Sequence, residues 1–183
     1  MLLPIYTYGS GVLRRVAEPV TKDFPNVKEL VNNMFETMHH AGGVGLAAPQ
    51  IGLSIRLLVI DLAALKDDDA ELAKFKITML NPEILEISAE TASGEEGCLS
   101  IPGVHENVNR HKRIKVKYLD TDFNQHITVF EDYRARVIQH EYDHLEGNMF
   151  TDKISPIRRQ FIKTKLVNII KGKTTAKYKI VNK

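Results

Sequence analysis

The sequence has few of the features that would place a protein outside the cytoplasm or in a membrane. Its single cysteine, Cys98, excludes an internal disulfide framework and is typical of a reducing compartment. No apolar run approaches the ~18 residues that a membrane span requires. The first residues lack the basic start and long apolar stretch of a signal peptide. We therefore expect a cytoplasmic protein with no membrane contact.

Acidic residues are absent from the end of the chain. No Asp or Glu follows Asp152, whereas ten lysines and arginines do. The formal net charge of the whole chain is +2, so the first 152 residues carry −8. A basic end on an acidic body favours a polyanionic partner. A solvated helix face explains the same charges equally well, so the charge pattern alone leaves both interpretations open.

Internal repeats and low-complexity linkers are also absent. At 183 residues the chain fits one domain that can bury a sizeable core. Helical spacing of apolar residues runs from Val27 to Ala41, where glycines stop the helix. Apolar or alternating runs predict strands at residues 56–61, 79–87, 114–119 and 126–130. Because the strands are grouped, with few alternating strand–helix units, we expect a single α+β domain.

Two helices are expected in the last third of the chain. Asp132 is the expected N-cap of the first, which ends near Gly147. Ser155 and Pro156 open the second, which ends by Gly172. We expect this C-terminal helix to turn four apolar side chains inward: Ile157, Phe161, Val167 and Ile170.

The most informative feature that is present is the stretch His140–His144, which spells His-Glu-x-x-His. Positions four apart lie on one face of a helix, so both imidazoles can bind one cation. Glu141 projects from nearly the same side and can reach a metal-bound water as a general base. The pattern is typical of metal-dependent hydrolases.

A catalytic metal site usually has three protein ligands and an open position for water. Cys98 is the candidate third ligand. A lone cysteine is more often a buried apolar filler, but glycine and Pro102 flank this one and the histidine pair needs a partner. A thiolate and two imidazoles leave a divalent cation with a net charge of about +1, which is acidic enough to deprotonate bound water near neutral pH.

A third feature is the glycine-rich stretch of residues 42–52. It is not a phosphate loop, because no Gly-Lys-Ser/Thr follows. Small residues allow close backbone approach, which would suit an extended peptide paired along this edge. Gln50 adds a neutral amide donor that could face an oxyanion. Taken alone, the stretch is more typical of a tight turn between helix and strand.

Together these stretches resemble a known family, the peptide deformylases, which remove the formyl group from new N-formylmethionyl peptides. The resemblance rests on three motifs in the same order, at Gly43–Gln50, Glu96–Ser100 and Gln139–Gly147. It implies a cytoplasmic, metal-dependent amidohydrolase with an α+β fold. Antiparallel or mixed sheets would surround a central helix that carries the third motif, and a C-terminal helix would follow.

The resemblance also implies roles for the residues at the matching positions. Cys98, His140 and His144 would be the metal ligands, and Glu141 would be the general acid and base. The usual metal of the family is Fe(II), which Zn(II), Ni(II) or Co(II) can replace. Other expected roles are oxyanion stabilisation by the Gln50 side chain and the main-chain N–H of Leu99, main-chain hydrogen bonds to the peptide from Gly45 and Gly97, and a methionine pocket lined by Val44 and Val137.

Two further positions follow from the same resemblance. Glu96 is expected to pair with Arg110 and so hold the cysteine loop. His105 stands where some members of the family have an arginine, a departure that bears on how the peptide is anchored and not on the chemistry.

Two other functions fit parts of the pattern. A zinc endopeptidase also uses His-Glu-x-x-His, but its third ligand is a downstream carboxylate or histidine; here Glu146 follows His144 by two positions and no histidine comes later. The second is a non-catalytic module that is stabilised by a structural metal ion and binds RNA through the basic end. A structural site needs four closed ligands and no base, so Glu141 argues against it.

We assign residues 1–172 to one catalytic domain that includes the C-terminal helix, and residues 173–183 to a basic tail. On this division, removing the tail should leave peptide hydrolysis intact. The expected partners are N-formylmethionyl nascent peptides and, through the basic C-terminal region, the ribosome, with no DNA. Contacts to ribosomal RNA would be salt-sensitive, because phosphate contacts release counterions.

Overall fold

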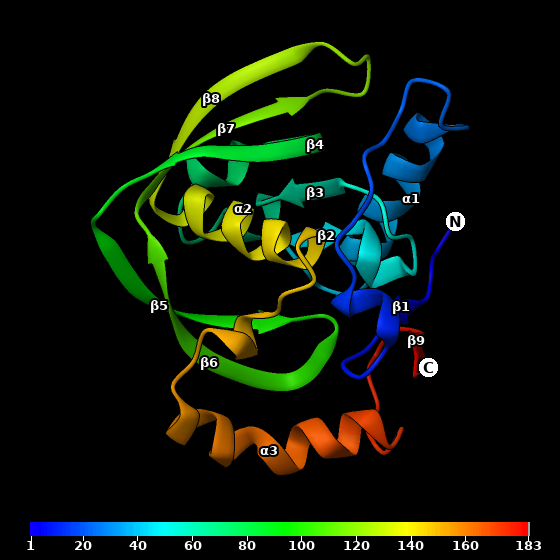
Figure 1. The fold of residues 1–183 in the computed structure, drawn as a ribbon, viewed down its shortest axis with the longest axis vertical. Coiled ribbons are helices and arrows are strands. Elements are labelled where there is room, and N and C mark those ends of the chain that lie inside the picture. Colours follow the sequence, from blue (N-terminus) through cyan, green and yellow to red (C-terminus); the bar gives the residue numbers. More distant parts are fainter. Residues whose placement is uncertain (183) are drawn as a thin grey trace.

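A five-stranded antiparallel sheet supports the helix that carries the two histidines (Figure 1). The structure is a computed structural model that describes residues 1–182. The strands of the sheet lie in the order β2 (Gly45–Ala47), β3 (Leu57–Asp61), β4 (Lys76–Ile87), β7 (Arg113–Leu119) and β8 (Gln125–Glu131). The helices are α1 (Val27–His40), α2 (Asp132–Leu145) and α3 (Pro156–Ile170). Short 3₁₀ turns lie at Gly11–Arg14, Ala48–Ile51, Ala63–Leu65, Leu72–Lys74 and Phe150–Asp152.

Strand β3 is buried on both faces, and its side chains alternate between two cores. Leu58 and Ile60 pack in the core that includes apolar residues of α2. Leu57 and Val59 pack in the core that includes apolar residues of α1. Because successive side chains of a strand point to opposite faces, α1 and α2 cover opposite faces of the sheet.

A second sheet is the long hairpin of β5 (Thr91–Cys98) and β6 (Ile101–His111), which lies on the other side of α2 (Figure 1). Its apolar side chains Val104 and Val108 join a third core with Phe150 and one face of α3. Helix α2 is therefore enclosed between the sheet and the hairpin, and ten of its residues are buried. This confirms the expected single α+β domain, with sheets around a central helix and a C-terminal helix.

The N-cap expected for α2 is wrong by one residue. Glu131 holds the cap position, and Asp132 is the first helical residue. Asp132 has φ +50° and its N–H donates to the carbonyl oxygen of Lys112 at 2.7 Å. The chain thus turns sharply out of β8, and it is held there by a main-chain bond from a neighbouring segment, which local propensity does not reveal.

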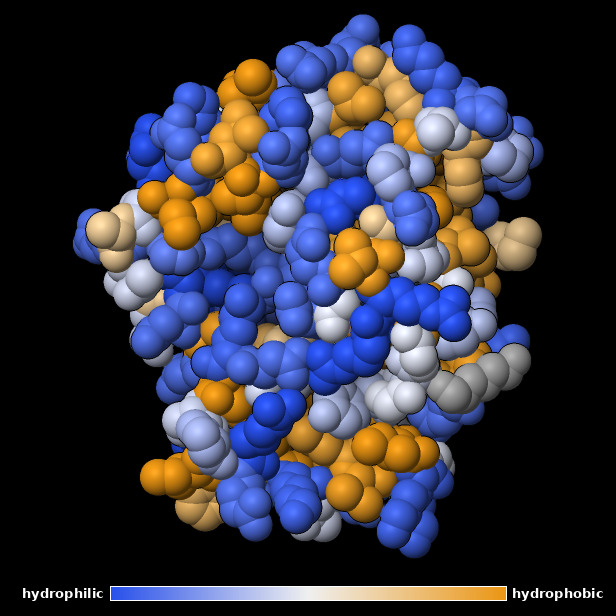
Figure 2. All heavy atoms as spheres, in the orientation of Figure 1, coloured by the Kyte–Doolittle hydropathy of each residue, from blue (hydrophilic) through white to orange (hydrophobic). Residues whose placement is uncertain are grey.

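The inward face expected for α3 is wrong for three of its four residues, although the start of the helix is right and Val167 is half-buried. Ser155 caps the helix, since its hydroxyl accepts from the N–H of Arg158 at 3.3 Å. Ile157 and Phe161 are each 71% exposed and Ile170 is 52% exposed, and Figure 2 shows apolar side chains on the surface over α3. The residues that pack inward are instead Ile162, Leu166 and Ile169.

The difference between the expected and the observed buried face of α3 has a physical cause. The buried residues Ile162, Leu166 and Ile169 form a stripe at spacings of four and three along the helix, which fits against β6. Arg158 lies beside this stripe and makes two bonds to the buried carboxylate of Glu106, at 2.8 and 2.9 Å. Since α3 carries apolar residues on several faces, this ion pair and the fit to β6 select which face is buried.

The end of the chain returns to its beginning. After α3, the chain runs back to β9 (Ile180–Val181), which pairs in parallel with β1 (Ile5–Tyr6). The residues set apart as a basic tail therefore lie against the domain as far as Asn182. Among residues 1–182, none of the helices is both long and apolar enough to cross a bilayer.

Candidate metal centre

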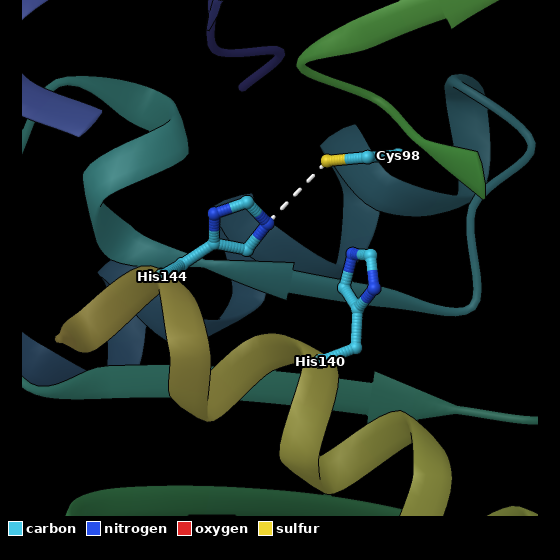
Figure 3. A group of neighbouring side chains, drawn as sticks. All are labelled: Cys98, His140 and His144. Atoms are coloured by element: carbon cyan, nitrogen blue, oxygen red, sulfur yellow. Dashed lines mark hydrogen bonds between the residues drawn. The ribbon is translucent and has the colours of Figure 1, made fainter. Parts of the chain in front are cut away.

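Three side chains from two elements of the fold point toward one another (Figure 3). His140 and His144 lie one turn apart on α2, and Cys98 ends β5. One donor atom from each lies within 4.8 Å of the others. The thiol sulfur of Cys98 is 3.3 Å from Nε2 of His144. One sulfur and two imidazole nitrogens at this spacing fit a single divalent cation of the zinc or iron type, with a fourth position open.

A carboxylate behind the site orients the first histidine. Nδ1 of His140 lies 2.9 Å from a carboxylate oxygen of Glu96, so this nitrogen donates and Nε2 is left for a cation. Burial would lower the pKa of His140, but its bonds to Cys98 and Glu96 raise the pKa above its ordinary value. Burial and the neighbouring His140 and Arg110 lower the pKa of His144, which keeps that ring neutral and able to bind a cation.

The predicted pair of Glu96 and Arg110 is confirmed, and it belongs to a larger network. Arg110 makes two bonds to Glu96, each of 2.9 Å, and a further bond to Asp143 on α2. Arg136 adds a bond of 2.8 Å to the same Glu96 carboxylate. Burial would raise the pKa of Glu96, but the bonds from Arg110 and His140 outweigh it and hold the pKa at about 2. Glu96 therefore stays ionised and ties β5, β6 and α2 together around the donors.

The candidate base, Glu141, is buried beside the same donors. Burial raises the pKa of its carboxyl to about 7. Its Oε2 atom has no hydrogen-bond partner among the described residues. An unpartnered buried carboxylate oxygen is costly unless something else bonds to it. A water or a substrate group in the cleft would complete its hydrogen bonding.

Gln50 is held by hydrogen bonds on both sides of its amide. Its oxygen accepts from the N–H of Ala47 at 2.8 Å. Its nitrogen lies 3.4 Å from the sulfur of Cys98 and 3.2 Å from the hydroxyl of Ser100. The glycine-rich stretch is therefore not only a turn: β2 and the 3₁₀ turn after it place an amide donor next to the donors of the cation.

A cleft of about 630 Å³ opens over these residues. It is lined by nine of the ten residues that were expected to bind the metal, bind the peptide or take part in catalysis: Val44, Gly45, Gln50, Gly97, Cys98, Leu99, Val137, His140 and Glu141. The tenth, His144, lies one helical turn further on, next to Cys98. The cleft thus gathers the expected residues from β2 and the 3₁₀ turn after it, from the end of β5 and the turn that follows, and from α2.

Other residues of the cleft had no expected role. Tyr133 and Arg136 line it from α2, and the segment Thr175–Tyr178 lines it from the end of the chain.

His105 lies over Gly97, where an added Cβ would be 2.7 Å from the imidazole ring. The departure at His105 therefore lies on the wall of the cleft, opposite a glycine that cannot accept a side chain without moving the ring.

The family is decided by comparison with known proteins. A model of the polypeptide deformylase family matches residues 2–160. The chain belongs to the peptide deformylase family. It is therefore an enzyme of the metal-dependent hydrolase class, and the match disfavours both the endopeptidase and the RNA-binding module. A peptide deformylase of Flavobacterium psychrophilum is 49% identical to this chain over 98% of the chain and 96% of the relative.

Solved structures of the family share the fold. The peptide deformylase of Thermus thermophilus is 42% identical, with a TM-score of 0.84 over 94% of this chain and 99% of that one. A class I type b peptide deformylase of Acinetobacter baumannii, solved with Met-Ala-Ser bound, is 37% identical, with a TM-score of 0.77 over 84% of this chain and 99% of that one. Both likenesses confirm the fold expected from the sequence.

The close approach of β2 to Glu141 allows a test of the role expected for this carboxylate. A Cβ added at Gly45 would lie 2.3 Å from a carboxylate oxygen of Glu141. Gly45→Ala is therefore expected to displace the carboxylate and lower kcat by at least ~10-fold, because small misplacements of reacting groups are costly. Gly11→Ala is the matched control, because an added Cβ there meets no atom of residues 1–182 within 4 Å. Wild-type kcat in Gly45→Ala would show that Glu141 needs no such precision.

Proposed function

We propose that this chain hydrolyses the N-formyl group of N-formylmethionyl peptides and releases formate and a free N-terminal methionine. The proposal rests on the buried carboxylate of Glu141, which lines the cleft beside the donors of Cys98, His140 and His144 in a chain of the peptide deformylase family, and whose Oε2 has no partner within residues 1–182. The Met-Ala-Ser bound to the Acinetobacter baumannii relative is a peptide with methionine at its N-terminus, as this reaction would release.

Cys98, His140 and His144 would hold the catalytic cation. We propose Fe(II), with Zn(II), Ni(II) or Co(II) as substitutes, because one thiolate and two imidazoles suit each of these ions. When bound, the cation would supply Lewis acidity, which lowers the pKa of water and polarises a carbonyl group. The Glu96 carboxylate would keep Nε2 of His140 directed at it.

The acid–base work falls to Glu141. Its carboxylate would take a proton from the attacking water and pass it to the departing amine, which then leaves as the peptide N-terminus. The amide of Gln50 and the main-chain N–H of Leu99 would face the oxygen that becomes negative after attack on the formyl carbon. Because the amide oxygen of Gln50 is already bonded to Ala47, its nitrogen is oriented before substrate arrives.

The remaining cleft residues would bind the peptide. Gly45 and Gly97 would offer main-chain hydrogen bonds to it from two strand edges, and Val44 and Val137 would contact the methionine side chain. A formyl carbon carries only hydrogen, so a glycine-walled site admits it where a bulkier acyl group is excluded. Specificity for the formyl group would then be steric.

The proposal is tested by acyl-group discrimination. Formate release from formyl-Met-Ala-Ser should follow Michaelis–Menten kinetics with the metal-loaded protein. The acetyl-Met-Ala-Ser peptide should be at least ~10²-fold poorer, because the acetyl methyl has no room at the site. Equal hydrolysis of both peptides, or internal cleavage of either, would refute a deformylase assignment.

We further propose that the enzyme works in the cytoplasm on nascent chains and contacts the ribosome through its basic C-terminal region. The single cysteine, needed as a thiolate, suits a reducing compartment. Lys163, Lys165 and Lys171 are all exposed. Phe161 does not pack on the domain as first expected but is exposed on the same helix, so the outer surface of α3 combines basic and apolar groups.

Charge reversal tests this contact without disturbing the core. Glutamate at Lys163, Lys165, Lys171 and Lys173 should weaken ribosome co-sedimentation at low salt by at least ~10-fold, because phosphate contacts release counterions. Hydrolysis of a short formyl peptide should not change. Glutamate at four exposed lysines of other segments, Lys22, Lys28, Lys66 and Lys74, is the control for net charge. Equal weakening in both proteins would mean that only overall charge matters.

A further inference from the structure

The end of the chain forms part of the cleft wall. Thr175, Ala176, Lys177 and Tyr178 all line the cleft, although they follow the catalytic helix by some thirty residues. Their path is fixed just beyond the cleft, where the N–H of Ile5 donates to the carbonyl of Lys179 at 2.9 Å and β9 pairs with β1. The segment is therefore anchored on the domain at the point where it passes the site.

Tyr178 makes the most direct contact between this segment and the site. Its hydroxyl donates to the main-chain carbonyl of Leu99 at 2.7 Å. Its ring is half-buried and packs, together with the Leu99 side chain, against the core beneath α1. A short hydrogen bond on a half-buried ring, which is itself held by packing, restrains both partners.

The residue that Tyr178 holds is the one that follows the thiolate ligand. Leu99 comes directly after Cys98, and Ser100 is fixed in turn: its carbonyl accepts from the N–H of Tyr8 at 2.8 Å, and its hydroxyl accepts from Gln50 at 3.2 Å. The turn between β5 and β6 is thus held by Tyr8 near the start of the chain, by Tyr178 near its end, and by Gln50, the expected oxyanion donor. Of these bonds, only the one from Tyr178 reaches the Leu99 carbonyl.

We infer that Tyr178 is a positioning residue for deformylation, which acts by fixing the backbone of Leu99 and hence the direction of its N–H. The inference rests on the proposed function, in which this N–H faces the developing oxyanion. A donor of this kind acts on charge that exists in the transition state, so its misalignment lowers kcat more than it changes KM. Residues 174–182 are then part of the active site, in contrast to the dispensable tail expected from the sequence.

The test removes only the hydroxyl. Tyr178→Phe should lower kcat for formyl-Met-Ala-Ser by ~10-fold, which is less than the 10²–10³-fold cost of deleting an oxyanion donor, because the N–H is displaced and not lost. KM should stay within about twofold, and metal content should stay at one ion per chain. Deleting residues 174–183 should lower kcat at least as much and also raise KM, because it removes the cleft wall.

Tyr118→Phe is the matched control, since Tyr118 lies on β7 outside the cleft. All rates are divided by the concentration of metal-loaded sites, and the melting temperature is measured for each protein. A kcat in Tyr178→Phe within twofold of wild type would overturn the inference, as would a loss that follows metal content or melting temperature alone. Wild-type protein that releases no formate would instead overturn the proposed function, so the two failures are distinguishable.

Discussion

Replacing Glu141 with glutamine should lower kcat for formate release by at least ~10²-fold, the usual scale for a lost general acid and base. The amide matches the carboxylate in size, so it can occupy the same buried place between β2 and the metal donors. It cannot take a proton from water or return one to the amine. Metal content, KM and melting temperature should therefore stay close to wild type while turnover falls.

The measurement is a steady-state comparison of kcat and KM, with metal analysis of the same samples. Glu131→Gln is the matched control: Glu131 is an exposed glutamate next to the start of α2, and its side chain makes no capping bond. It should behave as wild type. Near wild-type kcat in Glu141→Gln would mean that another group is the base.

Removing the thiolate should have the second large effect. Cys98→Ala leaves two imidazoles and should weaken metal binding by more than ~10²-fold, since even the loss of a group that only orients a ligand costs 10–100-fold. Cys98→Asp restores an anionic donor and should keep metal, with much reduced turnover. Metal affinity is read by competition with a chromophoric chelator under anaerobic conditions.

Oxidation is an independent test of whether Cys98 is a metal ligand. The Fe(II)-loaded enzyme should lose activity in peroxide, because both a thiolate and a ferrous ion are oxidisable. The Zn(II)-loaded enzyme should lose it more slowly, since zinc has no redox chemistry. A Cys98→Ala protein that still binds one ion with native affinity would exclude Cys98 as a ligand.

The helical parts of the fold could be predicted because their signals are local. The end of α1 follows from the two glycines after it, and the start and end of α3 follow from Ser155, Pro156 and Gly172. Four strands of the five-stranded sheet, β3, β4, β7 and β8, have apolar or alternating runs of their own, whereas β2 lies in a glycine-rich stretch that is more typical of a turn. The two histidines of α2 lie in one short motif, so their juxtaposition follows from helix geometry alone.

The hairpin of β5 and β6 could not be predicted in the same way. Strand β5 is rich in glycine and polar residues, which are poor strand formers. Along β6 the buried positions alternate as expected for a strand, but two of them are the charged residues Glu106 and Arg110. Arg158, the partner of Glu106, comes from α3, and Glu96, the partner of Arg110, comes from the other strand of the hairpin, so the buried alternation of β6 is visible only once these ion pairs are known.

The contact of Tyr178 with Leu99 is even less predictable from local sequence patterns. Seventy-nine residues separate the two. The pairing of Ile5 with Ile180 joins the two ends of the chain. Neither contact has a motif, and the lysines around Tyr178 predict solvent exposure. The convergence of Cys98, His140 and His144 could be expected from the sequence, whereas the residues that hold these side chains and shape the cleft needed the fold.

The central claim is that one cation, held by Cys98, His140 and His144, supports deformylation. Anaerobic titration of metal-free protein with Fe(II), read as the rate of formate release from formyl-Met-Ala-Ser, tests it most directly. The rate should rise linearly and reach its maximum at one equivalent per chain, and Cys98→Ala should show no such rise under the same conditions. Full formate release by metal-free wild-type protein, or the same one-equivalent end point in Cys98→Ala, would contradict the claim.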